Sequence, residues 1–272
     1  MNTVLLHFFN ENKAFYSVKK GAIGIVGGMG PAAGVDLAQK IISNTKAKTD
    51  QDHLDQMLFS FPKTIDDRTD FIIGKTNKNP GTSIAEIILK MEKAGAVVAG
   101  LACNSAHAPQ IFDQISAILK KKNSKIKLLH MIREVAFFIK KHYPDINNIG
   151  IMGTTGTYTV NLFDLIEEFG FATINISKEE QHLLHSAIYD SDYGIKSASS
   201  KISHKATSII TEICSKLKNK GAELIVFGCT EIPIAYNRQD FEKIPLIDPG
   251  LVLARALINE VAPEKLTTWH HQ

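Results

Sequence analysis

Hydrophobic and polar positions alternate along this chain on two length scales. Short apolar runs, rich in β-branched residues, recur at 22–26, 57–61, 97–101, 127–130, 149–152, 172–176, 224–227 and 245–247. Longer amphipathic stretches lie between them, for example 32–44, 83–94, 157–170 and 201–220, and a last one covers 251–261. The short runs predict buried strands, and the longer stretches predict helices. This alternation predicts an α/β protein with mainly parallel sheets flanked by helices.

The pattern of the first half returns in the second half at a constant offset. Residues 22–27 read AIGIVG and residues 148–153 read NIGIMG, so that Gly150 lies 126 positions after Gly24. The same offset relates further pairs, namely Gly30 to Gly156, Gly95 to Gly221 and Cys103 to Cys229. A single offset that holds at several places indicates duplicated halves.

The duplication predicts two pseudo-symmetric α/β domains with the active site in the cleft between them. The first domain covers residues 21–120, and a C-terminal helix at 250–262 packs back onto it. The second domain covers residues 126–240, and residues 1–20 form an N-terminal extension. The length of 272 residues is enough for two cores, each formed by roughly 100–150 residues.

Composition and charge exclude several classes of function. The net charge is only +3 and the lysines are spread over many segments, which argues against binding of nucleic acid. No apolar run approaches the roughly 18 residues of a membrane span. The apolar stretch at 4–9 lacks a basic start and a cleavage site, so it does not predict a signal peptide. Three widely spaced cysteines form no disulfide framework and are typical of the cytoplasm.

Two of the cysteines follow predicted strands directly. Cys103 comes after the run at 97–101, and Cys229 comes after the run at 224–227. Open α/β sheets bind ligands at the carboxyl ends of their strands. Both cysteines also precede an expected helix start, whose N–H groups and dipole lower the pKa of a thiol from about 8.5. The alternative is that each packs as a small hydrophobic residue, which is what we expect of Cys214 inside a predicted helix.

A pair of thiols at matched positions suits the inversion of a stereocentre that bears an acidic hydrogen. Such a reaction needs a base on one face of the carbon and an acid on the other. One cysteine is then the thiolate and the other the thiol, and their roles exchange when the substrate has the opposite hand.

Three motifs in consistent order resemble the aspartate/glutamate racemase family. They are GGMGP at 27–31, CNSAH at 103–107 and GCTEIP at 228–233, and Asp248-Pro249 also resembles the family's ending. The resemblance covers about residues 21–260, and it departs at Ser105, where the family more often has threonine. It implies a homodimeric isomerase that racemises aspartate or glutamate without pyridoxal phosphate or a metal. Cys103 and Cys229 would be its catalytic residues, serving the D- and the L-enantiomer respectively.

The resemblance also implies which residues bind the substrate. Arg68 and Lys196 match positions that contact the substrate's carboxylates; arginine suits bidentate capture and lysine supplies a point charge. Further candidates follow the thiols or form the glycine turn and its counterpart in the second half: Asn104, Ser105, Thr230, Gly28, Met29, Thr154 and Thr155. His107, four residues after Cys103, is either a packed, hydrogen-bonded histidine or one that tunes the thiol.

Other functions remain as alternatives. Residues 28–33 satisfy the dinucleotide pattern G-x-G-x-x-A, but no acidic residue ends the next strand, and Pro31 suits the first position of a helix. Cys103 and His107 supply only two potential metal ligands. Hydantoin racemases, maleate isomerases and arylmalonate decarboxylases use related cysteines, and a non-catalytic two-domain binding protein is a different class. Arg68 and Lys196 favour an acidic amino acid, with aspartate slightly ahead of glutamate.

Overall fold

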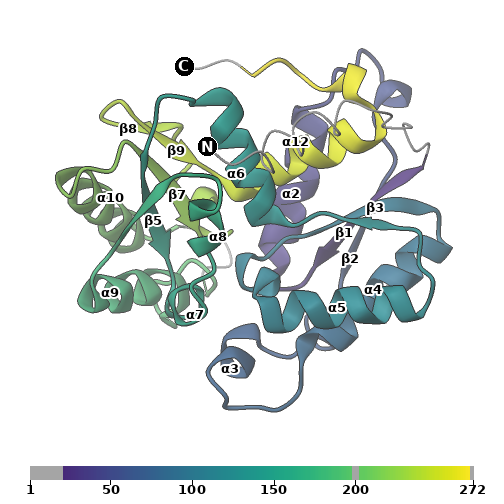
Figure 1. Cartoon of the computed structure of the whole chain (residues 1–272), viewed down its shortest axis with the longest axis horizontal. Coiled ribbons are helices and arrows are strands. Elements are labelled where there is room, and N and C mark those ends of the chain that lie inside the picture. Colours follow the sequence, from purple (N-terminus) through teal and green to yellow (C-terminus); the bar gives the residue numbers. More distant parts are fainter. Residues whose placement is uncertain (1–20, 198–201, 270–272) are drawn as a thin grey trace.

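Two sheets of mainly parallel strands form the framework of the molecule (Figure 1). The structure is a computed structural model that describes residues 21–197 and 202–269, and the predicted N-terminal extension lies outside the described residues. The first sheet has the order β2-β1-β3-β4. Its strands are β1 (Ala22–Gly27), β2 (Gln56–Ser60), β3 (Ala96–Leu101) and β4 (Lys127–Leu128).

The second sheet repeats this order as β6-β5-β7-β9 and adds β8 at its edge. Its parallel strands are β5 (Asn148–Gly153), β6 (Ala172–Asn175), β7 (Leu224–Gly228) and β9 (Ile244–Ile247), and β8 (Asp240–Phe241) pairs antiparallel with β9. The α/β class with parallel sheets and two similar halves is confirmed. The domain ranges 21–120 and 126–240 stay a prediction, because β4 and β9 extend the two sheets beyond them.

Proline marks the start of several long helices. α2 (Pro31–Ser43), α4 (Pro80–Lys93), α5 (Pro109–Lys121) and α12 (Pro249–Val261) all begin at a proline, whose missing N–H has no partner in a first turn. Asn79 and Asp248 cap two of them by accepting from backbone N–H groups. The prediction that Pro31 opens a helix is confirmed. The other long helices are α6 (Met131–His142), α9 (Lys178–Tyr189) and α10 (His204–Asn219).

Short helices fill the connections between these elements. They are η1 (Asp50–Asp52), α3 (Arg68–Ile72), η2 (Asn104–His107), α7 (Thr155–Thr159), α8 (Asp164–Glu167), α11 (Ile232–Ala235) and η3 (Pro263–Lys265).

Two predicted elements are wrong in extent. The single helix expected at 157–170 is two short helices, α7 and α8, separated by Asn161 with a φ of 48°. Asparagine is one of the few residues that tolerates this left-handed conformation, and the helix cannot continue through it. The strand expected at 127–130 is only the two-residue β4, because His130 caps the following helix and accepts from the N–H of Arg133 at 3.4 Å.

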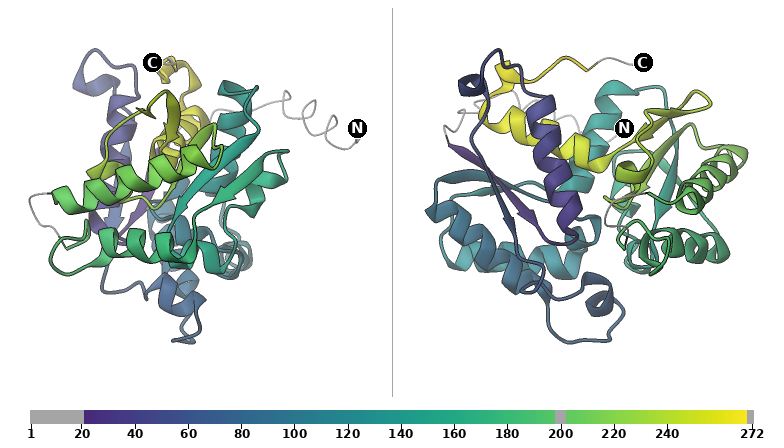
Figure 2. Two further views of the ribbon diagram at one scale, coloured as in Figure 1. Left: turned by 90° about the vertical axis from the view of Figure 1, so that its left-hand side faces the viewer. Right: turned by 180° about the vertical axis from the view of Figure 1, so that it is seen from behind.

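The largest hydrophobic cluster joins the two halves. It contains Ile25 of the first sheet, Val226 of the second sheet and Leu253 of α12, all buried. α12 packs against α2 and β3 of the first half, and it also contacts α6 and β7. The right-hand view of Figure 2 shows α12 (yellow) crossing α2 (purple) beside the first sheet. The C-terminal helix therefore contributes to the packing of both sheets.

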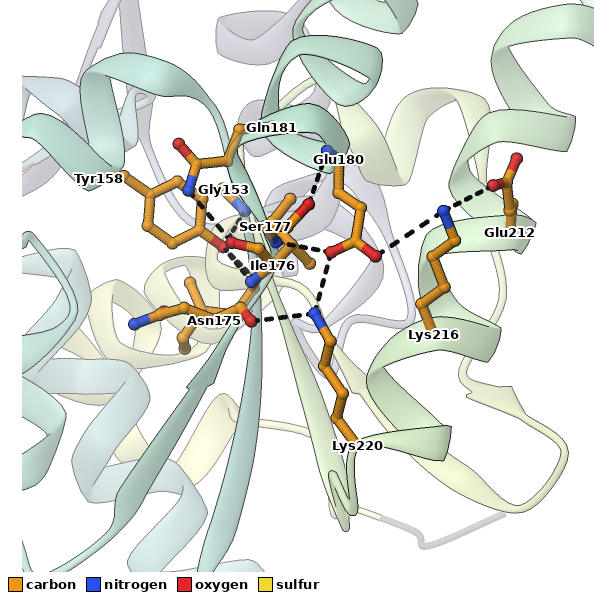
Figure 3. A network of polar contacts seen from close by, with 11 residues as sticks. Gly153, Tyr158, Asn175, Ile176, Ser177, Glu180, Gln181, Glu212, Lys216 and Lys220 are labelled. Atoms are coloured by element: carbon orange, nitrogen blue, oxygen red, sulfur yellow. Dashed lines mark hydrogen bonds and ion pairs between the residues drawn. The ribbon is translucent and has the colours of Figure 1, made fainter.

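A network around Glu180 holds the start of α9 (Figure 3). The Glu180 carboxylate accepts from the N–H of Ser177 at 2.6 Å and pairs with Lys220 at 2.9 Å. The Ser177 hydroxyl in turn accepts from the N–H of Glu180 at 3.2 Å, which completes a capping box. The network fixes a helix that ends at Tyr189, a residue of the site described below.

None of the helices within residues 21–197 and 202–269 combines the length and the apolar character needed to cross a bilayer.

Candidate active site

Cys103 and Cys229 line one small cavity. Cys103 lies two positions after β3 and Cys229 directly follows β7, so the carboxyl ends of two equivalent strands supply the two thiols. Both cysteines are buried, with 5% and 8% of their surface exposed. The cavity has a volume of about 20 Å³, which is room for about one water molecule. It is lined by Met29, Arg68, Cys103, Asn104, Ser105, Thr154, Thr157, Tyr189, Lys196, Gly228, Cys229, Thr230 and Glu231.

Most residues predicted for the site are among those that line this cavity. The exceptions are Gly28 and Thr155. Gly28 has a φ of +92°, and a Cβ atom there would lie 3.0 Å from the backbone nitrogens of Phe61 and Pro62. Gly28 therefore allows the chain to turn closely past the end of β2. Thr155 is the first residue of α7, one position beyond the lining residue Thr154.

A hydroxyl and a guanidinium lie on the Cys103 side of the cavity. The Sγ atom of Cys103 is 3.3 Å from the hydroxyl of Ser105. Arg68 is held by the backbone, since its two terminal nitrogens donate to the carbonyls of Asp66 and Met29, each at 3.2 Å. Its Nε atom is buried and has no hydrogen-bond partner among the described residues. Burial acts to lower the pKa of Arg68, but the adjacent Cys103 and Asp67 raise it, and the net shift is upward.

A carboxylate lies on the Cys229 side. The Cys229 thiol donates to the Oε2 atom of Glu231 at 3.1 Å, and the hydroxyl of Thr230 donates to the same atom at 3.2 Å. The other oxygen of Glu231 forms an ion pair with Lys196 and accepts from the N–H of Gly30 at 3.3 Å. Glu231 is therefore a shared acceptor for both halves of the chain.

These surroundings keep Cys229 protonated. Burial raises the pKa of the Cys229 thiol well above its ordinary value, and the Glu231 carboxylate raises it further, while Lys196 acts in the opposite direction. The prediction that a helix start lowers the pKa of this thiol is wrong. α11 is a single turn that begins only at Ile232, so its dipole is small compared with the effect of an adjacent carboxylate.

Lys196 is not an isolated cation. Its Nζ atom pairs with Glu231 and lies 5.5 Å from the centre of the Tyr189 ring. Burial acts to lower the pKa of Lys196, but Glu231 and Cys229 raise it, so that the net shift is upward and the ammonium form is stabilised. Tyr189 and Lys196 thus form one wall of the cavity.

Hydrogen bonds from two further side chains join the loops around the site. The Nδ2 atom of Asn104 donates to the carbonyl of Phe227 in β7 at 3.1 Å, which links the first half to the second. The Oδ1 atom of Asn104 is buried and has no partner among the described residues. The hydroxyl of Thr157 donates to the carbonyl of Gly228 at 3.2 Å. The loop that carries Cys229 is therefore tied to both Asn104 and α7.

His107 and Cys214 are both packed inside the protein. His107 is buried, and its Nδ1 atom donates to the carbonyl of Cys103 at 2.9 Å, so it is the packed, hydrogen-bonded histidine. Burial, with His130 beside it, lowers the pKa of His107 to about 3. Cys214 is fully buried in a hydrophobic cluster of the second half, as predicted.

Four residues line the cavity that were not predicted for the site: Glu231, Tyr189, Thr157 and Gly228. Glu231 had a signal in the sequence, because it lies at the 126-residue offset from Ser105 and both residues stand two positions after a thiol. Tyr189 and Thr157 had no such signal. They reach the cavity through the folding of α9 and α7.

This arrangement can perform acid–base chemistry on a small anion. Two thiols can act as proton donor and proton acceptor, and a guanidinium such as that of Arg68 can pair with a carboxylate. Within the described part of the chain, no three His, Cys, Asp or Glu side chains are grouped so as to hold a metal ion.

A family model and solved structures relate the chain to amino-acid racemases. A family model described as Asp/Glu/Hydantoin racemase matches residues 26–257. The chain is similar to the solved structure of an aspartate racemase from Picrophilus torridus, with 26% identity and a TM-score of 0.70 over 89% of this chain and 94% of that one. An aspartate racemase homologue from Pyrococcus horikoshii OT3 shares the fold at 20% identity, with a TM-score of 0.66 over 89% and 99% of the two chains. A glutamate racemase isoform from Bacillus anthracis shares it at 13% identity, with a TM-score of 0.58 over 91% and 83%.

Proposed function

Because the chain belongs to the Asp/Glu/Hydantoin racemase family and is an isomerase of the racemase type, we propose that it interconverts L- and D-aspartate, with glutamate as the second candidate substrate. The observation that carries this proposal is the placement of Cys103 and Cys229. They follow equivalent strands of duplicated halves and line one cavity together with Arg68.

The reaction is a 1,1-proton transfer at Cα. A thiolate removes the α-proton from one face, and the thiol of the other cysteine delivers a proton to the opposite face. Negative charge develops on the substrate in the transition state, and preorganised donors and cations stabilise it. Arg68 and the hydroxyls of Ser105, Thr154 and Thr230 supply these groups. By resemblance, Cys103 serves the D-enantiomer and Cys229 the L-enantiomer.

The polar groups of the cavity can bind the remaining parts of an acidic amino acid. Arg68 binds one carboxylate, and its backbone hydrogen bonds to Met29 and Asp66 fix its position. The Oδ1 atom of Asn104 has an unused lone pair that suits the substrate ammonium. Lys196 binds the second carboxylate of the substrate. This carboxylate then competes with Glu231 for the ammonium group of Lys196.

The cavity must open before a substrate enters. A volume of about 20 Å³ holds about one water molecule and not an amino acid. Movement of α3 or of the two halves relative to each other would admit the substrate, as in enzymes that close over their ligands.

Exchange of the α-proton tests the proposal directly. Protein is incubated in deuterium oxide with L-aspartate or, separately, L-glutamate, with a reductant and without added pyridoxal phosphate, and the α-proton is followed by NMR. We expect loss of the α-proton signal and appearance of the D-enantiomer in a chiral assay, undiminished by a metal chelator.

The two thiols are tested by Cys103→Ser and Cys229→Ser, each of which abolishes racemisation. Cys214→Ala is the matched control, because Cys214 lies in the core of the second half and away from the cavity. Undiminished turnover in either active-site variant contradicts the two-thiol mechanism. If the unmodified protein exchanges neither amino acid, hydantoins and maleate are the next substrates to test.

A cytoplasmic location and a homodimer complete the proposal. The three cysteines are free thiols, which suits a reducing compartment. Light scattering on the purified protein measures its mass in solution, and a value near twice 30.0 kDa supports the dimer.

A further inference from the structure

The two thiols have different partners at matched positions. Two residues after Cys103, the duplicated sequence has Ser105, and two residues after Cys229 it has Glu231. Each partner contacts its thiol, at 3.3 Å for the serine hydroxyl and 3.1 Å for the carboxylate. The duplication therefore retained the contact and changed its charge.

The charged side chains near the two thiols also differ. On the Cys103 side, Arg68 donates to two backbone carbonyls and lies close enough to interact with the Cys103 sulfur. A cation beside a sulfur favours the thiolate. On the Cys229 side, the cation Lys196 is already paired with Glu231, so the thiol faces a carboxylate whose charge is only partly compensated. An anion beside a sulfur favours the thiol.

Glu231 is also firmly held in place. It is 3% exposed and accepts hydrogen bonds from Cys229, Thr230 and the N–H of Gly30 in addition to its ion pair with Lys196. Its carboxylate therefore offers the Cys229 thiol a fixed acceptor for its proton.

We propose that Glu231 is a positioning residue that keeps Cys229 as the thiol of the resting enzyme, which leaves Cys103 to act as the first base. This inference rests on the proposed two-thiol function. The enzyme without substrate is then prepared for one hand of substrate only, the one whose α-hydrogen faces Cys103.

The proton balance of a turnover follows. The Cys103 thiolate takes the α-proton and becomes a thiol, while the S–H bond of Cys229 breaks and its proton goes to the opposite face of Cα. The product leaves an enzyme with a Cys103 thiol and a Cys229 thiolate beside Glu231. A proton must return from Cys103 to Cys229, through solvent or through a turnover in reverse, before the resting form is restored.

The pH dependence of thiol reactivity reveals which cysteine is protonated in the resting enzyme, and steady-state rates do not. The equilibrium constant of a racemisation is unity, so kcat/KM is equal for the two enantiomers whatever the resting form. Iodoacetamide reacts with thiolates, so the pH dependence of alkylation reports the protonation of each cysteine separately. Cys103 and Cys229 are buried to a similar extent, so a difference in their alkylation does not arise from different exposure.

The experiment alkylates the unmodified full-length protein for a fixed short time at a series of pH values. Mass spectrometry of peptides then gives the fraction of each cysteine modified. We expect Cys103 to react at a lower pH than Cys229, and the buried core residue Cys214 to react only after denaturation. In Glu231→Gln, the midpoint for Cys229 moves down by roughly one to three pH units, because a neighbouring like charge is lost and Lys196 is released. The midpoint for Cys103 moves much less.

Glu212→Gln is the matched control, because Glu212 is another lysine-paired carboxylate of the second half but is exposed and contacts neither thiol. We expect both midpoints in this variant to stay where they are in the unmodified protein. Equal midpoints for Cys103 and Cys229 in the unmodified protein overturn the inference, and this measurement requires no variant to fold. An unchanged midpoint for Cys229 in folded Glu231→Gln also overturns it. Failure of the proposed function is distinguishable, since it appears as absent α-proton exchange whatever the order of reactivity.

Discussion

At the scale of single residues, Arg68 lies on the Cys103 side of the cavity and Glu231 on the Cys229 side. The backbone carbonyls of Met29 and Asp66 hold the guanidinium in place before any substrate binds. Such preorganisation lowers the entropy that a ligand must lose on binding. The resemblance to a family predicts that Arg68 binds a carboxylate, but no sequence pattern indicates the two carbonyls that hold its guanidinium.

Replacing Arg68 by alanine should lower kcat/KM for the acidic amino acid by about 10- to 150-fold, because a hydrogen bond to a charged group contributes about 1.5–3 kcal/mol. Arg68→Lys should restore only part of the loss, since lysine lacks the bidentate geometry. Steady-state racemisation assays measure both. Arg133→Ala, at an exposed arginine outside the cavity, is the control. A kcat/KM within twofold of the unmodified protein in Arg68→Ala would show that Arg68 does not bind the substrate.

His107 makes the stability of the protein sensitive to acid. Burial, with His130 beside it, lowers its pKa to about 3 in the folded protein, from the ordinary value of 6.5. Between these pH values the unfolded chain binds more protons at this residue than the folded chain does. Stability that is present above pH 6.5 is therefore lost as the pH falls toward 3, by up to about 1.4 kcal/mol per pH unit.

His107→Asn should make the free energy of unfolding less steep in this pH range, because asparagine keeps a donor for the Cys103 carbonyl but does not titrate. Urea unfolding at several pH values gives the slope. His204→Asn, at an exposed histidine, should leave the slope unchanged. The same slope in His107→Asn as in the unmodified protein would contradict the assignment.

At the scale of elements, α3 and α7 bring the two halves together at the site. α3 begins with Arg68, and the two helices are in contact. Gly156 of α7 lies so close to α3 that a Cβ atom there would be 2.9 Å from the hydroxyl of Thr69 and 3.2 Å from its methyl group. Figure 1 shows α3 at the edge of the first half, apart from the helices that cover its sheet. Gly156 therefore permits the approach of the segment that carries Arg68.

Gly156→Ala should displace α3 and impair catalysis by roughly 10- to 100-fold, because even a 1 Å misplacement of a binding group is costly. Thr69→Ala in the same chain should restore much of the activity, since the remaining Cβ atom of residue 69 lies at an ordinary contact distance of 3.5 Å. Racemisation rates of the single and double variants measure this rescue. A double variant as impaired as Gly156→Ala would rule out the steric explanation.

At the scale of the whole molecule, one hydrophobic cluster spans both sheets. Leu253 of α12 is fully buried in it, together with Ile25 of β1 and Ile149 of β5. A core shared in this way couples the unfolding of the two halves, as in small proteins that unfold in a single transition. α12 is the last long helix of the described chain, so the fold of the first half depends on residues far along the sequence.

Leu253→Ala should destabilise the protein by about 2–5 kcal/mol, the usual cost of truncating a buried leucine. Circular dichroism and the fluorescence of Trp269 should report the same lowered denaturation midpoint, because both halves lose packing. Val35→Ala is the control at a residue that is 60% exposed, and its stability should change by less than about 0.5 kcal/mol. Two separated transitions in Leu253→Ala would show that the halves unfold independently.

The sequence by itself determined the order of the elements, the parallel sheets, the duplication and the two strand-end cysteines. These features depend on local periodicity and on a repeat, both of which are visible in one dimension. Local signals also identified Pro31 as a helix start, but they could not show that Asn161 interrupts the helix expected at 157–170.

Only the tertiary structure decided what surrounds each thiol. The contact of Gly30 with Glu231 joins residues 201 positions apart, and that of Asn104 with Phe227 joins residues 123 positions apart. No local pattern encodes such contacts, because they depend on how the two sheets and α12 pack together. The charge beside a buried sulfur sets its protonation state. The difference between the surroundings of Cys103 and those of Cys229 is therefore a property of the folded molecule, even though the sequence places the two cysteines symmetrically.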